Sequence, residues 1–277
     1  MRPEHGPIDY DGISDDGYGL SSDEETEPVP QTTELLNQEQ IFAQIALAIE
    51  LTRQTGQEHC FMACFDPAGQ IMVNELQAGS DVRIKTNDPA FGAGHLKGRG
   101  FHLPEGYTPF MIFHTHAKTN PYPSLEDLIY FHSIAEQNYN LSSNSDRYWV
   151  NPVNIISDGR GEIGVYQYSP ETVLKLDDDD LIEGVADAVI KIGQQLGVEK
   201  WSGEKLASVR GFSSKNFLVG MHQGKVAMDY PDYVVQHPEK IPQIYNAVGL
   251  NMAPGKKYSD SNLLEAVRAF EICQKWD

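Results

Sequence analysis

Two histidines in the middle of the chain have the residue type and the spacing of a metal site. His114 and His116 follow a short apolar run, residues 109–113, that predicts a buried strand. Side chains two apart on a strand lie on the same face, so both imidazoles could bind one ion. Asp127 stands in the first turn of the next helical pattern, where a loop could bring its carboxylate to them. The spacing predicts three ligands and a fourth position open for water, as catalytic zinc requires.

The same residues also fit an ordinary helix start. Ser124 immediately precedes the helical pattern and could cap it, and Asp127 would be favoured there by the helix dipole. Either histidine by itself is more often an ordinary polar residue. The combination favours the metal site: His-x-His, seven residues, Ser, two residues and Asp, in a strand-loop-helix context.

This combination resembles the signature of the JAMM (JAB/MPN) zinc metalloproteases, which His114, His116, Ser124 and Asp127 match at every fixed position. Many members of that family are isopeptidases that remove ubiquitin or related modifiers from proteins. The resemblance covers residues 34–170 and implies that the two histidines and Asp127 bind zinc. It further implies that Ser124 helps to stabilise a tetrahedral oxyanion, and that the substrate is a protein, with ubiquitin or a ubiquitin-like modifier as a candidate.

The family also places a glutamate at the start of the first strand, where this chain has Glu58. The resemblance implies that Glu58 takes a proton from the attacking water and passes it to the leaving amine. Glu75, near the end of the second expected strand, is the alternative base, but polar residues are expected there in any case. One departure from the family is Ala117, where a proline usually follows the second histidine; this weakens the rigidity of the loop and leaves the ligands unchanged.

Two other functions stay open. One is an inactive MPN-like scaffold that binds a protein partner, which the intact ligand set and base candidate disfavour. The other is a metal-dependent amidohydrolase or phosphoesterase, whose barrel would need six or seven further strand-helix units, whereas the chain after residue 170 is mostly helical in pattern. A looser resemblance, in the layout of the hairpin at residues 58–74, is to JAB-like domains of bacterial toxins and effectors, which allows export into a host cell.

The surrounding pattern predicts an α/β (α+β) fold, in which helices flank a mixed β-sheet. Gly56 ends the first helix and a turn at residues 66–69 closes a hairpin. The expected elements are a helix at 34–55, strands at 59–65, 70–74, 81–85, 109–113, 153–157 and 163–168, a glycine-rich loop at 92–106 and a helix at 124–137.

Three regions follow from this pattern. Residues 1–33 are acidic, with few apolar residues, and predict a disordered tail. Residues 34–170 form the metallohydrolase-like domain. Residues 171–277 predict a mostly helical extension, either a separate subdomain or a wrap on the first core. Its apolar stripes are Ile182, Val185, Val189, Ile192 and Leu196, then Leu263, Val267, Phe270 and Cys273.

Composition limits the partners and the compartment. The 277 residues carry a formal charge of −19, which disfavours nucleic acid as a partner. No apolar run is long enough for a membrane helix and no leader is visible, so we expect a soluble protein made in the cytosol. The 3 cysteines are an odd number, typical of free thiols in a reducing compartment.

Overall fold

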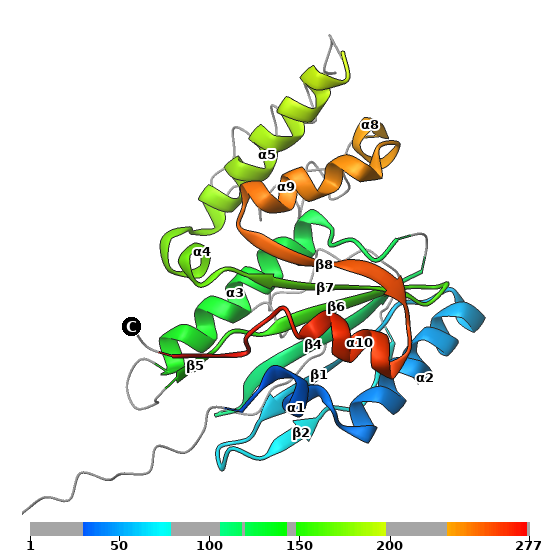
Figure 1. The fold of residues 1–277 in the computed structure, drawn as a ribbon, viewed down its shortest axis with the longest axis vertical. Coiled ribbons are helices and arrows are strands. Elements are labelled where there is room, and N and C mark those ends of the chain that lie inside the picture. The colour runs from blue at the N-terminus through cyan, green and yellow to red at the C-terminus, as the bar shows by residue number, and fades with distance from the viewer. Residues whose placement is uncertain (1–29, 79–105, 118–119, 143–147, 198–231, 276–277) are drawn as a thin grey trace, which may run out of the picture.

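A seven-stranded mixed sheet forms the centre of the molecule (Figure 1). The structure is a computed structural model and describes residues 30–78, 106–117, 120–142, 148–197 and 232–275. The strands run in the order β2-β1-β4-β6-β7-β8, and β3 pairs with the other end of β1. Only the β4–β6 pair is parallel within the described sheet. The strands are β1 (His59–Phe65), β2 (Ile71–Val73), β3 (Gln77–Ala78), β4 (Thr108–His116), β6 (Val153–Asp158), β7 (Glu162–Tyr168) and β8 (Leu250–Lys257).

Helices cover both faces of this sheet, and a second small sheet of two strands lies beside it (Figure 1). The small sheet pairs β5 (Tyr148–Val150) with β9 (Cys273–Lys275). The α-helices are α1 (Thr32–Leu36), α2 (Glu39–Thr55), α3 (Leu125–Ser142), α4 (Pro170–Lys175), α5 (Asp178–Gln195), α8 (Asp232–Val235), α9 (Ile241–Ala247) and α10 (Asp260–Val267). A short 3-10 helix, η3 (Pro238–Lys240), precedes α9.

The sheet divides the hydrophobic core in two. The α3-side core packs sheet residues such as Met62 and Ile112 against α3, α4, α5, α8 and α9. The α2-side core packs alternate residues, such as Phe61 and Phe113, against α1, α2 and α10. Because both faces are covered, β1 and β4 are buried at consecutive positions, which explains the apolar run at residues 109–113.

The structure confirms the predicted hairpin, the strands at 153–157 and 163–168 and the end of the first helix. Gly56 ends α2 with a φ of 69°, in the left-handed region that favours glycine. The first helix differs from the prediction because it is broken at Asn37 and Gln38 into α1 and α2. The strand expected at 81–85 and the loop expected at 92–106 lie outside the described residues.

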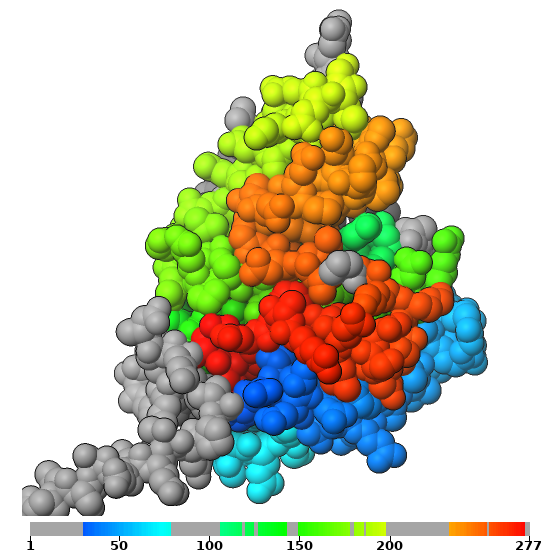
Figure 2. Space-filling model, in the orientation of Figure 1, coloured from blue at the N-terminus to red at the C-terminus, as the bar shows by residue number. Residues whose placement is uncertain are grey.

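The C-terminal region is more than a helical extension. β8 adds a strand to the main sheet beside β7, and β9 pairs with β5. The helix expected to continue through Phe270 and Cys273 ends earlier, at Val267, and Cys273 begins β9 instead. Figure 2 shows these C-terminal residues, in red, packed against the N-terminal helices, in blue. The described residues of this region contribute to the hydrophobic cores on both faces of the main sheet.

Thr32, near the N-terminal end of the described residues, forms hydrogen bonds with residues near the C-terminal end. These bonds should contribute to the stability of the fold. Although Thr32 falls in the region predicted as tail, it starts α1 and is buried. Its hydroxyl donates to the Phe270 carbonyl at 2.8 Å and accepts the Ile272 N–H at 3.0 Å. We expect Thr32→Val to lower the free energy of unfolding by about 1–3 kcal/mol, because it leaves two buried backbone groups without this partner.

Urea denaturation of Thr32→Val beside Thr33→Val measures this effect. Thr33 lies in the same helix, and its side chain is only partly buried. Equal stability of the two variants would show that the Thr32 bonds contribute nothing measurable.

Cys60, Cys64 and Cys273 are free thiols, as predicted. Burial raises the pKa of both Cys64 and Cys273 to about 12. Among the helices that the structure describes, none is both long and apolar enough to cross a membrane.

Candidate metal centre

The end of β4 brings the two predicted histidine ligands together. β4 extends through His114 and His116, and the two side chains lie on the face of the sheet that is covered by α3. Their Nε2 atoms are 3.1 Å apart, and their ring centroids are separated by 4.9 Å. Two ring nitrogens this close point to a common position that a metal ion could occupy.

Asp127 completes this cluster from the first turn of α3. Its Oδ1 lies 3.5 Å from His114 Nε2, and its Oδ2 lies 3.4 Å from His116 Nε2. One donor atom from each of these three residues lies within 4.8 Å of the others. In the described part of the chain this is the one such group of three or more histidine, cysteine or acidic side chains. The predicted ligand set is therefore assembled, and the three residues could hold a metal ion.

Ser124 fixes the carboxylate of Asp127. The Ser124 N–H and hydroxyl both donate to Asp127 Oδ2, at 2.9 and 2.7 Å, and the Asp127 N–H approaches Ser124 Oγ at 3.2 Å. This reciprocal pairing caps α3, so the ordinary helix-start interpretation is correct for these two residues. It is also compatible with metal binding, because both Ser124 donors bind Oδ2, whereas Oδ1 lies 3.5 Å from His114 Nε2.

A second contact sets the orientation of His116. Its Nδ1 lies 3.1 Å from the Asn120 carbonyl, which can only accept, so this nitrogen carries the proton. Nε2 is then left as the nitrogen that faces the cluster. Outer-shell bonds of this kind orient histidine ligands in metal proteins. The donor set, its burial and this outer shell all fit a divalent metal.

The histidines and Asp127 shift each other's pKa values. Burial by itself would raise the pKa of Asp127, but the charges and contacts of His114 and His116 hold it well below its usual range. Burial would lower the pKa of His116, but contact with Asp127 raises it above its usual value, with smaller contributions from Glu58 and the Asn120 carbonyl. The metal-free protein therefore keeps a proton on His116 to higher pH than an ordinary histidine would.

This raised pKa predicts a pH dependence for metal binding. His116 paired with Asp127 stabilises the metal-free fold fully below the ordinary histidine pKa of about 6.5, and this contribution is lost as the pH rises through the raised pKa. A metal binds neutral imidazole, so its affinity follows the opposite trend. We expect the affinity to fall by up to about tenfold per pH unit below the raised pKa, and this fall to begin above pH 6.5.

Calorimetric titration with Zn²⁺ in two buffers of different ionisation heat measures both the affinity and the protons released. We expect proton release near neutral pH, since the metal displaces the proton of His116. An affinity that stays constant between about pH 6 and about pH 8 would contradict the predicted displacement of this proton.

Glu58 lies beside the cluster, next to the first residue of β1. β1 and β4 are antiparallel with Cys60 opposite His114, so Glu58, two residues before Cys60, lies near the end of β4 that carries His116. The side chain of Glu58 is partly buried, and its charge contributes to the raised pKa of His116. Glu75, the alternative base, is exposed and lies between β2 and β3.

The opposite face of the sheet holds a buried network that sequence reasoning missed. Thr115, which stands between the two histidines, accepts the His59 N–H at 2.8 Å and contacts the Thr52 hydroxyl at 2.5 Å. His59 Nδ1 lies 3.1 Å from Thr52 Oγ1 and 3.0 Å from the Gln57 carbonyl. This network joins α2, the start of β1 and the end of β4, so it supports the strand ends that carry Glu58 and both histidines. In the sequence, the one sign of this network is Thr115, the threonine between the two histidines.

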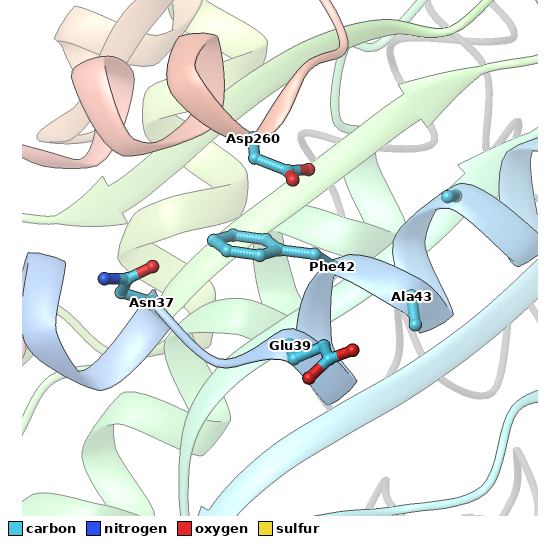
Figure 3. A pocket seen from close by; sticks show the side chains of 6 residues that line it. Asn37, Glu39, Phe42, Ala43 and Asp260 are labelled. Atoms are coloured by element: carbon cyan, nitrogen blue, oxygen red, sulfur yellow. The ribbon is translucent and has the colours of Figure 1, made fainter.

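An open hollow lies away from the metal cluster (Figure 3). It has a volume of about 530 Å³ and lies between the start of α2 and the start of α10. Its lining residues are Asn37, Glu39, Phe42, Ala43, Ala46 and Asp260. These helices cover the α2 side of the sheet, whereas the histidines face α3. The hollow is therefore separate from the candidate metal centre.

Comparison with protein-family models finds no match to this chain, and comparison with curated proteins finds none either.

Proposed function

We propose that this chain is a zinc-dependent hydrolase of the JAMM type that cuts peptide or isopeptide bonds in proteins. The observation that carries the proposal is the convergence of His114 Nε2, His116 Nε2 and the Asp127 carboxylate within 4.8 Å. Two imidazoles and one carboxylate are a donor set typical of catalytic zinc, which keeps its fourth position for water or substrate. The resemblance of the sequence to the JAMM signature supports the choice of zinc and of this reaction.

In the proposed mechanism, the bound zinc, Glu58 and Ser124 each have a different chemical role. When bound, zinc supplies Lewis acidity, which acidifies a water molecule and polarises the scissile carbonyl. Glu58 takes a proton from the attacking water on its carboxylate and delivers it to the leaving amine. The effect of its charge on His116 supports this role, and the exposure of Glu75 makes that residue the weaker candidate.

Ser124 has a second task in this proposal. Its N–H and its hydroxyl both hold Asp127 Oδ2, so the carboxylate stays anchored by the N–H if the hydroxyl turns away. The freed hydroxyl would donate to the oxyanion that develops on the substrate carbonyl. Ser124 thus orients a ligand and stabilises developing charge.

Substrate would approach from the side of His116. Its side chain is 19% exposed, against 6% for His114 and 4% for Asp127. We propose a protein substrate, with ubiquitin or a ubiquitin-like modifier as the first candidate, on the strength of the family resemblance. The net charge of −19 is unfavourable for a nucleic-acid substrate.

Cleavage assays on ubiquitin chains of each linkage, on linear fusions and on ubiquitin-like fusions test this proposal. We expect cleavage that requires zinc and is lost in Glu58→Gln. A zinc-loaded wild type that cuts neither this panel nor a general peptide library would overturn the hydrolase and favour an inactive, partner-binding scaffold. The barrel-type amidohydrolase is disfavoured because the strands next to β1 and β7 in the described sheet are all antiparallel to them.

A further inference from the structure

The segment between β4 and α3 must be held in place for Asp127 to meet the histidines. Its described part, residues 120–124, has no helix or strand and includes Pro121 and Pro123, both buried. Proline has no N–H, and buried carbonyls in such a segment need donors from elsewhere. In addition, Ala117 stands where the resembled family usually has a rigid proline.

Two buried tyrosines supply donors to this segment. The Tyr166 hydroxyl, from β7, donates to the Pro121 carbonyl at 2.6 Å, and the Tyr245 hydroxyl, from α9, donates to the Pro123 carbonyl at 3.4 Å. Their rings contact each other edge to face, with centroids 5.7 Å apart. Tyr166 is fully buried and Tyr245 is 1% exposed. Each tyrosine therefore fixes the other as well as its carbonyl.

Gly164 makes room for the Tyr166 ring. Its position in the sheet is level with His114, because it pairs with Ile156, which in turn pairs with His114. A Cβ at Gly164 would clash with the Tyr166 hydroxyl and would lie 2.8 Å from two ring carbons. The ring thus lies over Gly164 and brings its hydroxyl towards the level of the histidines. An alanine at this position would force the ring to move.

We propose that Tyr166 and Tyr245 are positioning residues of the metal centre, which act through the Pro121 and Pro123 carbonyls to place Asp127 against His114 and His116. This inference rests on the proposed metal site and adds to it. Tyr245 belongs to the C-terminal region, so the packing of that region on the core takes part in forming the site. Loss of either hydroxyl leaves the three ligands in the sequence but loosens the segment that presents one of them.

Chelator competition for Zn²⁺ with the full-length protein measures the effect. We expect Tyr166→Phe to weaken zinc binding about tenfold, in the range of outer-shell substitutions, and Tyr245→Phe to weaken it less because its bond is longer. Gly164→Ala should weaken zinc binding while Tyr166 stays in the chain. The visible spectrum of the Co²⁺-loaded protein should change in Tyr166→Phe, which a loss of stability alone would not cause.

Tyr233→Phe is the matched control. Its hydroxyl also donates to a backbone carbonyl, that of Val189 at 3.0 Å, but between α8 and α5. Unchanged zinc affinity in this variant, beside a loss in Tyr166→Phe, would support the proposal. Zinc affinity of Tyr166→Phe within twofold of wild type, or an equal loss in Tyr233→Phe, would overturn it. A wild type that binds no zinc would refute the metal site itself and remove the basis of this inference.

Discussion

Glu58→Gln is expected to yield a folded, zinc-loaded protein whose hydrolysis is slower by about a hundred- to ten-thousand-fold, the usual contribution of a general base. The amide matches the carboxylate in size but cannot accept a proton from water. Glu58 is partly buried near the end of β4, so the change should disturb packing little. Its charge also helps to raise the pKa of His116, so Glu58→Gln should lower that pKa and allow zinc to bind at slightly lower pH.

Glu75→Gln is the matched control for this substitution. Glu75 is exposed between β2 and β3, and we expect its loss to leave both zinc content and rate close to wild type. Rates on the best substrate of the cleavage panel, with zinc content measured in the same samples, separate the two variants. If Glu58→Gln keeps its rate and Glu75→Gln loses it with zinc retained, then the base is Glu75 and the assignment of Glu58 is wrong.

Removal of one of the proposed metal ligands is expected to reduce zinc binding strongly. His116→Ala or Asp127→Ala should lower zinc affinity by more than the roughly 10- to 100-fold that follows loss of an outer-shell partner. The physical reason is that each removes one of three converging donors. Metal content after dialysis against a weak chelator should fall from about one zinc per chain to nearly none.

A second aspartate variant isolates the role of the carboxylate. Asp127→Asn keeps an oxygen that can accept the Ser124 N–H, and so keeps the cap of α3, but it loses the negative charge. We therefore expect Asp127→Asn to fold as well as wild type and to bind zinc weakly. His237→Ala controls for removal of a histidine, because His237 contacts Glu239 on the surface, away from the cluster. Full zinc occupancy in His116→Ala would rule out His116 as a ligand.

Much of the candidate metal centre could be predicted because its three proposed ligands lie on one strand and the helix that follows. The spacing of His114 and His116 places both on one face of any strand, and Ser124 with Asp127 marks a helix start in any context. The helix-cap and metal-ligand interpretations of Ser124 and Asp127 are compatible with each other. In the structure the same carboxylate caps the helix and faces the histidines.

The C-terminal region, residues 171–277, was harder to predict because its strand β8 contains residues that strands usually avoid. β8 contains Pro254 and Gly255, and it lies in the region that the sequence predicts to be mostly helical. An edge strand tolerates such residues, since only one side pairs with a neighbour, here β7. The apolar spacing from Leu263 to Cys273 fits a helix equally well, yet the chain turns after Val267 and uses Cys273 in β9.

The hydrogen bonds that hold the segment between β4 and α3 in place leave almost no recognisable pattern in the sequence. The carbonyls of Asn120, Pro121 and Pro123 accept bonds from His116, Tyr166 and Tyr245, and a carbonyl belongs to every residue type. Tyr245 lies 122 residues from Pro123 along the chain, so only the fold brings them together. Local pattern identifies candidate ligands, whereas the packing of distant elements decides how firmly such side chains are held.

Anomalous diffraction at the zinc edge, from crystals of the wild-type protein grown with zinc, tests the proposed centre most directly. We expect one strong peak at full occupancy, about 2.0–2.2 Å from His114 Nε2, from His116 Nε2 and from an oxygen of Asp127. Glu58 should lie within reach of the open coordination position. A peak bound by other residues, or no peak in crystals grown with excess zinc, would contradict the assignment of this cluster as the catalytic metal site.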